Sequence, residues 1–204
     1  MIELDVFLPN ILPFAPGVAE PTALANVVKA AQVFCERTRL WRGTSVLNVT
    51  PTSVNLVTVP ADAELFEIES ARFDGHDLKP MSISDLDAYH PGWRTLGNGA
   101  PRWITQTEPG YLQVAPASTG VLQLSTFLRP IDAAQQLPDL FSQYTKMIAD
   151  GALAEILMLP AQAYSDPARA QFFANRFDNR IDGLCKLTIK GQQRAPVRSR
   201  AQFF

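Results

Sequence analysis

The sequence predicts an α+β fold in which an antiparallel β-sandwich or barrel-like domain is flanked by one N-terminal helix and two C-terminal helices. Changes in the hydrophobic period support this prediction. Apolar residues recur at i, i+3, i+4 and i+7 between Pro21 and Arg39, as on one face of a helix. From Ser45 to Pro130 the period falls to two, which is typical of strands, and after Pro130 it becomes helical again.

Composition limits the classes of protein to which the chain can belong. It has 204 residues, of which 47% are hydrophobic and 19% charged, with 18 Lys and Arg against 20 Asp and Glu. The chain is too apolar for intrinsic disorder, and no apolar run reaches the ~20 residues of a membrane-spanning helix. Its acidic start is unlike a secretory signal, and two cysteines are too few for a disulfide framework. We expect a soluble, intracellular, globular protein without a membrane partner.

The charge balance also bears on partners. The charged fraction is below the roughly 25% of ordinary domains. Charge is depleted in the cores of interfaces, so this composition is typical of a chain surrounded by other subunits. The net charge of −2 argues against a dedicated nucleic-acid binder.

Turn residues and composition divide the chain into five parts. We expect an extended N-terminal arm over 1–20, helices over 21–41 and 131–190, the β-domain over 42–130, and an extended basic, aromatic tail over 191–204. The N-terminal arm is apolar, and its three prolines remove backbone donors and oppose a helix. Such an arm needs a surface to lie on, either its own domain or a neighbour.

The β-domain contains several short alternating segments separated by turn residues. The expected helical turn Ser82–Tyr89, with Ser82 as its cap, interrupts them. The expected strands are Ser45–Thr50, Ser53–Val59, Leu65–Phe73, Pro101–Thr107, Tyr111–Ala115 and Val121–Arg129.

Two helices follow the strands. The first is expected from Leu137 to about Leu159, where Pro160 stops it. Gly151 inside it costs ~1 kcal/mol relative to Ala unless close packing or a bend requires it. Ser165-Asp166-Pro167 then caps the last helix. That helix carries an apolar stripe of Phe173, Phe177, Ile181 and Leu184.

Metal-binding and nucleophilic motifs are not found. His76 and His90 are the two histidines, and neither has a metal-ligand spacing to the other or to a cysteine. Cys35 and Cys185 lie on or at the end of helical apolar stripes, where buried packing is the expected role. We therefore expect no cofactor, no metal and no enzymatic activity.

Carboxylates leave one alternative open. A small carbohydrate-active hydrolase would use Asp74, Asp77 or Asp85, but no spacing in the sequence predicts that two of them meet in a cleft. Asp74 and Asp77 lie in a turn, where aspartate is favoured for local reasons.

The C-terminal tail combines cations with apolar anchors and has no acid. A frayed terminus is the common alternative for a chain end. Phe203 and Phe204 favour docking on an acidic, grooved protein partner, although a nucleic-acid-binding accessory protein that uses the basic tail is a further alternative. The candidate docking residues are Arg194, Pro196, Val197, Arg198, Arg200, Phe203 and Phe204.

Several stretches resemble a known family. "LFEIESARFDGHDLKPMSISDLDAYHPGWRT", "GAPRWITQTEPGYLQVAPAST" and "GVLQLSTFLRP" look like the β-domain of tailed-bacteriophage head-to-tail adaptor (connector) proteins, including relatives of the tail tubular protein A group. "LPDLFSQYTKMIADGALAEILMLP", "YSDPARAQFFANRFDNRI" and "APVRSRAQFF" resemble the helical part and terminus of that family.

The resemblance implies a structural protein of the virion, made in the host cytoplasm and placed at the head–tail junction. Such adaptors form a ring, typically twelve-fold, beneath the portal protein. The helical part and the C-terminal tail dock on the portal, and the β-domain faces the tail or nozzle protein. Genome DNA passes through the lumen without specific binding during packaging and ejection.

Overall fold

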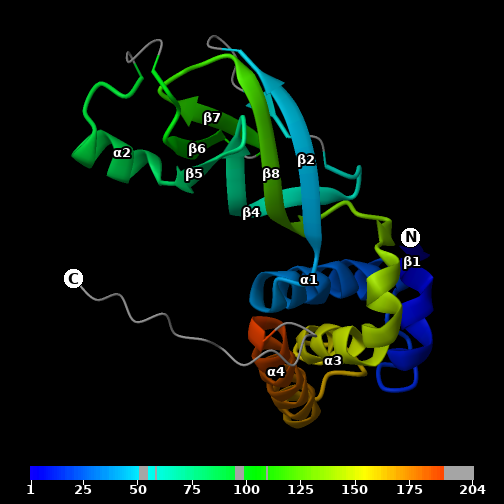
Figure 1. Cartoon of the computed structure of the whole chain (residues 1–204). Coiled ribbons are helices and arrows are strands. Elements are labelled where there is room, and N and C mark those ends of the chain that lie inside the picture. Colours follow the sequence, from blue (N-terminus) through cyan, green and yellow to red (C-terminus); the bar gives the residue numbers. More distant parts are fainter. Residues whose placement is uncertain (51–54, 58, 95–98, 109, 191–204) are drawn as a thin grey trace. The chain divides into compact units, whose positions relative to one another are not determined.

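The chain divides into a helical unit, Met1–Leu40 with Gln135–Phe204, and a β unit, Trp41–Ala134. The computed structural model describes residues 1–50, 55–57, 59–94, 99–108 and 110–190 (Figure 1). The expected α+β class, with one helix before the sheet and two after it, is confirmed. Within the described residues, no helix has both the length and the apolar character needed to cross a bilayer.

The prediction of an extended N-terminal arm is wrong, because much of this segment is helical. After strand β1 (Ile2–Glu3), the 3-10 helix η1 spans Leu4–Asn10 and contains Pro9. Proline fits a 3-10 helix because its fixed φ near −65° lies in the 3-10 range. Phe7 and Ile11 are fully buried, and η1 packs on helices of its own unit. The apolar residues of this segment therefore belong to the core of the helical unit.

Helix α1 (Glu20–Thr38) confirms the first helical prediction. Pro21 occupies the first turn, and Arg39 ends the helix in the left-handed conformation with a φ of 52°. The predicted packing role of Cys35 is also confirmed, because its thiol is buried. Desolvation, and secondarily the negative charge of Glu36, raises the pKa of that thiol far above its usual range.

In the described part of the β unit, seven strands form one curled sheet in the order β2-β8-β4-β5-β6-β7-β3 (Figure 1). Its inner face carries the apolar core, which includes Phe73, Ile104 and Leu122. The strands are β2 (Arg42–Val49), β3 (Asn55–Leu56), β4 (Ala63–Phe73), β5 (His76–Pro80), β6 (Trp103–Glu108), β7 (Tyr111–Ala115) and β8 (Gly120–Pro130).

Most of the predicted strands are present. β7 has the predicted bounds, β4, β6 and β8 lie within two residues of them, and β2 begins three residues early. Of the predicted strand 53–59, residues 55–56 form β3, while 53–54 and 58 lie outside the described residues.

The prediction of a purely antiparallel domain is wrong at one pair, because β5 runs parallel to β6. β5 was not predicted, since four of its five residues are exposed and show no clear alternation. The connection from β5 to β6 contains helix α2 (Ile83–Tyr89), and parallel neighbours need such a crossover. Ser82 caps α2 as predicted, accepting a hydrogen bond from the Asp85 backbone N–H at 3.1 Å.

The helix expected from Leu137 to Leu159 is shorter and begins differently. Short strand β9 (Gln136–Leu137) pairs with β1, and the 3-10 helix η2 (Asp139–Tyr144) precedes α3 (Thr145–Ile156). Phe141 and Tyr144 are three residues apart, and both pack on Phe34, with ring centroids 5.6 and 5.1 Å from it. A period of three residues per turn places such a pair on one side of the helix.

Helix α4 (Pro167–Lys190) completes the helical unit and packs on α3 and α1. Asp166 caps it, accepting a hydrogen bond from the Arg169 backbone N–H at 3.0 Å. Gly151 of α3 lies at the crossing of the three helices. A Cβ atom there would be 3.0 Å from the Ala30 Cβ of α1 and 3.0 Å from the Phe177 Cζ of α4. Of the two explanations that the sequence offered for Gly151, close packing or a bend, the structure supports close packing.

We predict that Gly151→Leu destabilises the chain by overpacking, which costs typically about 1–3 kcal/mol. Gly183→Ala in α4 is the matched control, because a Cβ there meets nothing within 4 Å. That change should stabilise the chain by up to about 1 kcal/mol, since alanine favours a helix. Urea unfolding monitored by circular dichroism measures both. Equal effects of the two variants would contradict the packing role of Gly151.

Candidate functional site

The predicted docking residues Arg194, Pro196, Val197, Arg198, Arg200, Phe203 and Phe204 lie outside the described residues. Helix α4 leads directly into this segment, so the candidate site is built from α4 and the side chains that fix its position in the helical unit.

The acids considered for catalysis have structural roles. Asp74 accepts a hydrogen bond from the Val121 backbone N–H at 2.8 Å, Asp77 pairs with Arg72 at 2.7 Å, and Asp85 accepts one from the Ser82 hydroxyl at 2.8 Å. Asp77 and Asp85 line two different grooves of the β unit. The structure therefore does not bring these acids together as a pair of catalytic carboxylates.

The histidines and Cys185 have no ligand geometry in the described residues. His76 begins β5 and is exposed, and His90 stacks on Trp103 with ring centroids 4.0 Å apart. Cys185 is half-buried, and its Sγ lies 3.1 Å from the Arg37 carbonyl oxygen. The described part of the chain contains no group of three or more His, Cys, Asp or Glu that could hold a metal ion.

One flank of α4 is held by a buried carboxylate. Asp150 of α3 has only 3% of its side chain exposed, and it pairs with two arginines of α4. Arg176 Nε donates to Asp150 Oδ2 at 2.7 Å, its Nη2 donates to Oδ1, and Arg180 Nη1 donates to Oδ2 at 3.0 Å. The hydrogen bond to Asp150 is the main cause that raises the pKa of Arg176. The buried charge is thus compensated from two successive turns of α4.

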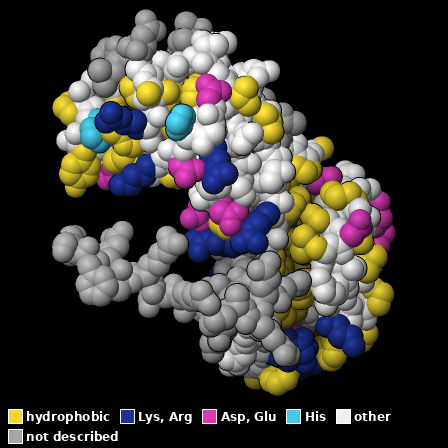
Figure 2. Space-filling view, in the orientation of Figure 1, with side chains coloured by type: hydrophobic (Ala, Val, Ile, Leu, Met, Phe, Trp, Pro, Cys, Tyr) yellow, Lys and Arg dark blue, Asp and Glu magenta, His cyan; other side chains and the backbone are white. Residues whose placement is uncertain are grey.

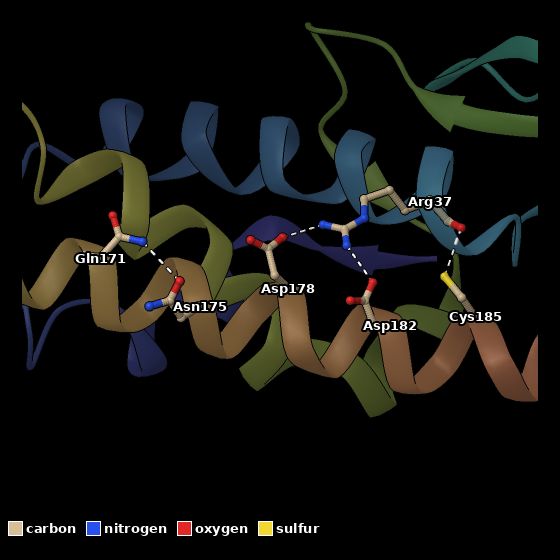
Figure 3. Close-up of polar contacts among 6 residues, drawn as sticks. All are labelled: Arg37, Gln171, Asn175, Asp178, Asp182 and Cys185. Atoms are coloured by element: carbon tan, nitrogen blue, oxygen red, sulfur yellow. Dashed lines mark hydrogen bonds and ion pairs between the residues drawn. The ribbon is translucent and has the colours of Figure 1, made fainter.

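The other flank of α4 carries a polar row that faces α1 (Figure 3). Arg37 of α1 reaches between two acids of α4, pairing with Asp178 and, at 2.8 Å, with Asp182. The hydrogen bond to Asp178 is the main cause that raises the pKa of Arg37. Figure 3 shows that Cys185 follows in the same row and that Gln171 bonds to Asn175 one turn earlier on α4. Contacts on both flanks therefore fix the rotation of α4 about its axis.

An aromatic patch lies where α4 begins, made of Phe14, Arg169, Phe172, Phe173 and Arg176. Phe173 is buried and meets both other rings, with centroids 5.3 Å from Phe14 and 5.5 Å from Phe172. The guanidinium groups lie over these rings: Arg169 is 5.7 Å from Phe14, and Arg176 is 5.3 Å from Phe172. Figure 2 shows hydrophobic and basic side chains side by side over this end of the helical unit.

A groove between α1, α3 and α4 encloses about 510 Å³. Small residues at the helix crossing form its floor, because Gly151 and Ala30 let the helices approach closely. The remaining lining residues are apolar or polar, and they include three carboxylates, one lysine and one glutamine. We call it the helical groove; its lining comprises Lys29, Ala30, Gln32, Val33, Glu36, Gly151, Ala154, Glu155, Ala174, Phe177 and Asp178.

Similarity to a known family covers most of the chain. A family model described as SU10 adaptor protein matches residues 12–200. The chain belongs to the SU10 adaptor protein family. No curated protein matches it. Membership confirms the resemblance to phage head-to-tail adaptors and gives the adaptor a structural, non-enzymatic role in the phage particle, with virion proteins as binding partners.

The pairing of Asp150 with Arg176 and Arg180 was not predicted from the sequence of the adaptor. The sequence signal that could have predicted it is an acid within the apolar stretch of α3 together with two arginines four residues apart on α4, which share one helix face. An acid on a buried face needs a cationic partner, because an unpaired buried charge is costly.

We predict that Arg176→Ala/Arg180→Ala destabilises the adaptor by about 3–5 kcal/mol, because a buried carboxylate is left without a counter-charge. Adding Asp150→Asn to this double variant should restore part of the lost stability, since it removes the buried charge. Chemical denaturation measures all three variants. If Asp150→Asn lowers stability further in that background, desolvation of the carboxylate is not the controlling cost.

Proposed function

We propose that the adaptor forms a twelve-fold ring of identical subunits between the portal protein and the tail or nozzle protein, at the head–tail junction of the virion. Subunits made in the host cytoplasm join the ring during particle assembly, and the genome passes through its lumen during packaging and ejection. The observation that carries the proposal is the family match, which covers residues 12–200 and therefore both the helical and the β unit.

The helical unit is proposed as the portal-facing part and the β unit as the tail-facing part. In support, α4 belongs to the helical unit, and the C-terminal segment with the docking residues follows it. The ion pairs of Asp150 and Arg37 fix α4, so the origin of that segment is fixed within the unit. A fixed origin lowers the ordering entropy that docking has to overcome.

The segment from Arg194 to Phe204 is proposed to dock on the portal. Its arginines suit an acidic surface, and its aromatic end suits an apolar pocket. Ordering a chain segment on a partner costs conformational entropy, so the proposal requires both kinds of contact. The net charge of −2 is compatible with a lumen through which DNA moves, because a strongly basic lining would retain phosphate.

We predict that deleting residues 194–204 leaves a folded protein that no longer joins the portal. Co-sedimentation with purified portal rings measures the association, and circular dichroism checks the fold. A truncated adaptor that still co-sediments like the full chain would contradict the docking role of this segment.

We predict that Phe203→Ala/Phe204→Ala weakens portal binding without lowering the melting temperature, because these rings contact the partner and not the adaptor's own core. Phe203→Leu/Phe204→Leu is the matched control and should retain more of the binding, since it keeps apolar side chains. A large loss of thermal stability in the alanine variant would instead assign the two rings to the core of the adaptor.

A further inference from the structure

We propose that neighbouring subunits of the ring contact each other through the two flanks of α4, with the aromatic patch of one subunit seated in the helical groove of the next. The partner is therefore a second copy of this chain. The inference rests on the proposed ring and goes beyond it by naming the two surfaces that meet.

The two surfaces lie on different sides of one helix. An α-helix turns by about 100° per residue, so Ala174 and Asp178, which border the groove, project about 160° and 120° away from Phe172 of the patch. The buried stripe of α4, which includes Phe173 and Phe177, lies between the patch side and the groove side of the helix. A subunit that presents different surfaces on its two sides can form head-to-tail contacts, and such contacts give a ring when the rotation between neighbouring subunits closes.

Both surfaces expose apolar side chains. Phe172 is 58% exposed and Phe14 39%, while Val33 of the groove is 40% exposed. Single exposed apolar residues are ordinary, but Phe172 and Phe14 belong to one contiguous aromatic cluster together with buried Phe173. Aromatic residues, including phenylalanine, and arginine are enriched at protein interfaces. Seating Phe172 over Val33 would remove apolar surface from water on both subunits.

The charges of the two surfaces are complementary. Arg176 of the patch is already paired with Asp150, and Asp178 of the groove with Arg37, so Arg169 and Glu155 are the charges on which the contact depends. Arg169 lies 4.0 Å from its acid Asp166, at the limit of an ion pair, which leaves most of its donors for another carboxylate. Glu155 borders the groove, and its side chain makes no ion pair with the described residues. An Arg169–Glu155 pair across the interface would fix its register.

The helical groove also has room for an aromatic side chain. Its floor is made of Gly151, Ala30, Ala154 and Ala174, whose small side chains leave room where larger ones would fill it. Gly151 thus belongs both to the close contact between the helices and to the lining of the groove beside it. The same feature that packs the three helices provides a seat for an inserted side chain.

Disulfide trapping between two different variants tests the contact. Phe172→Cys, labelled with nitrogen-15, is mixed with unlabelled Val33→Cys, both in the full chain with Cys185→Ser. Because the two cysteines are on separate chains, a mixed dimer cannot arise within one molecule. Mild oxidation is carried out on the adaptor alone and on portal rings. The matched control replaces Val33→Cys by Val46→Cys, an exposed site in β2 of the β unit.

The proposal expects the mixed disulfide dimer of Phe172→Cys with Val33→Cys to form at least about tenfold more than the control dimer. Equal yields, or no dimer with Val33→Cys, would overturn it. Native mass spectrometry of the same samples distinguishes a failure of the proposed subunit contact from a failure of the proposed ring. If rings form without the selective dimer, the proposed contact fails and the ring stands; if no multimer forms even on the portal, the proposed function fails as well.

A charge exchange gives a second readout. Arg169→Glu should weaken subunit association at least about tenfold, since the introduced carboxylate then faces that of Glu155 across the contact. The double variant Arg169→Glu/Glu155→Arg restores an opposite-charge pair and should recover most of the association. If the double variant associates no better than Arg169→Glu, the pairing of these two positions is excluded.

Discussion

The helical unit depends on the compensation of one buried charge. The Asp150 carboxylate is almost fully removed from water, and Arg176 and Arg180 bond to it from successive turns of α4. A buried carboxylate tolerates few arrangements, because losing either its partners or their geometry is costly. It therefore sets which residues of α4 face α3. Given that rotation, Asp178 and Asp182 face Arg37 of α1, and Phe172 is left on the outer flank.

Local patterns were sufficient to predict most of the fold. The amphipathic stripe of α1, the proline at its start and the alternation in β8 are all properties of a few neighbouring residues. Features that depend on distant residues were not predictable. Strand β5 has little alternation and is defined by its neighbours β4 and β6, and the N-terminal segment forms a 3-10 helix where it packs on the helical unit.

The same distinction applies to the site. The tail was recognisable from composition alone, because cations without acids and a terminal Phe pair are visible in the sequence. The partners of Asp150 and the helical groove depend on how α1, α3 and α4 pack, and this packing is decided by Gly151, Ala30 and Phe177 together. No periodicity within one helix specifies which residues of another helix it meets.

These features combine into a coherent account of an adaptor. Ion pairs fix α4, the fixed helix presents different surfaces on its two flanks, and the segment after it is the part proposed to dock on the portal. The most direct test is the native mass of the full chain, measured alone and after mixing with portal rings from the same phage. The account predicts a complex that contains one closed ring of adaptor subunits per portal ring. Portal rings that retain their original mass in the presence of excess adaptor would contradict it.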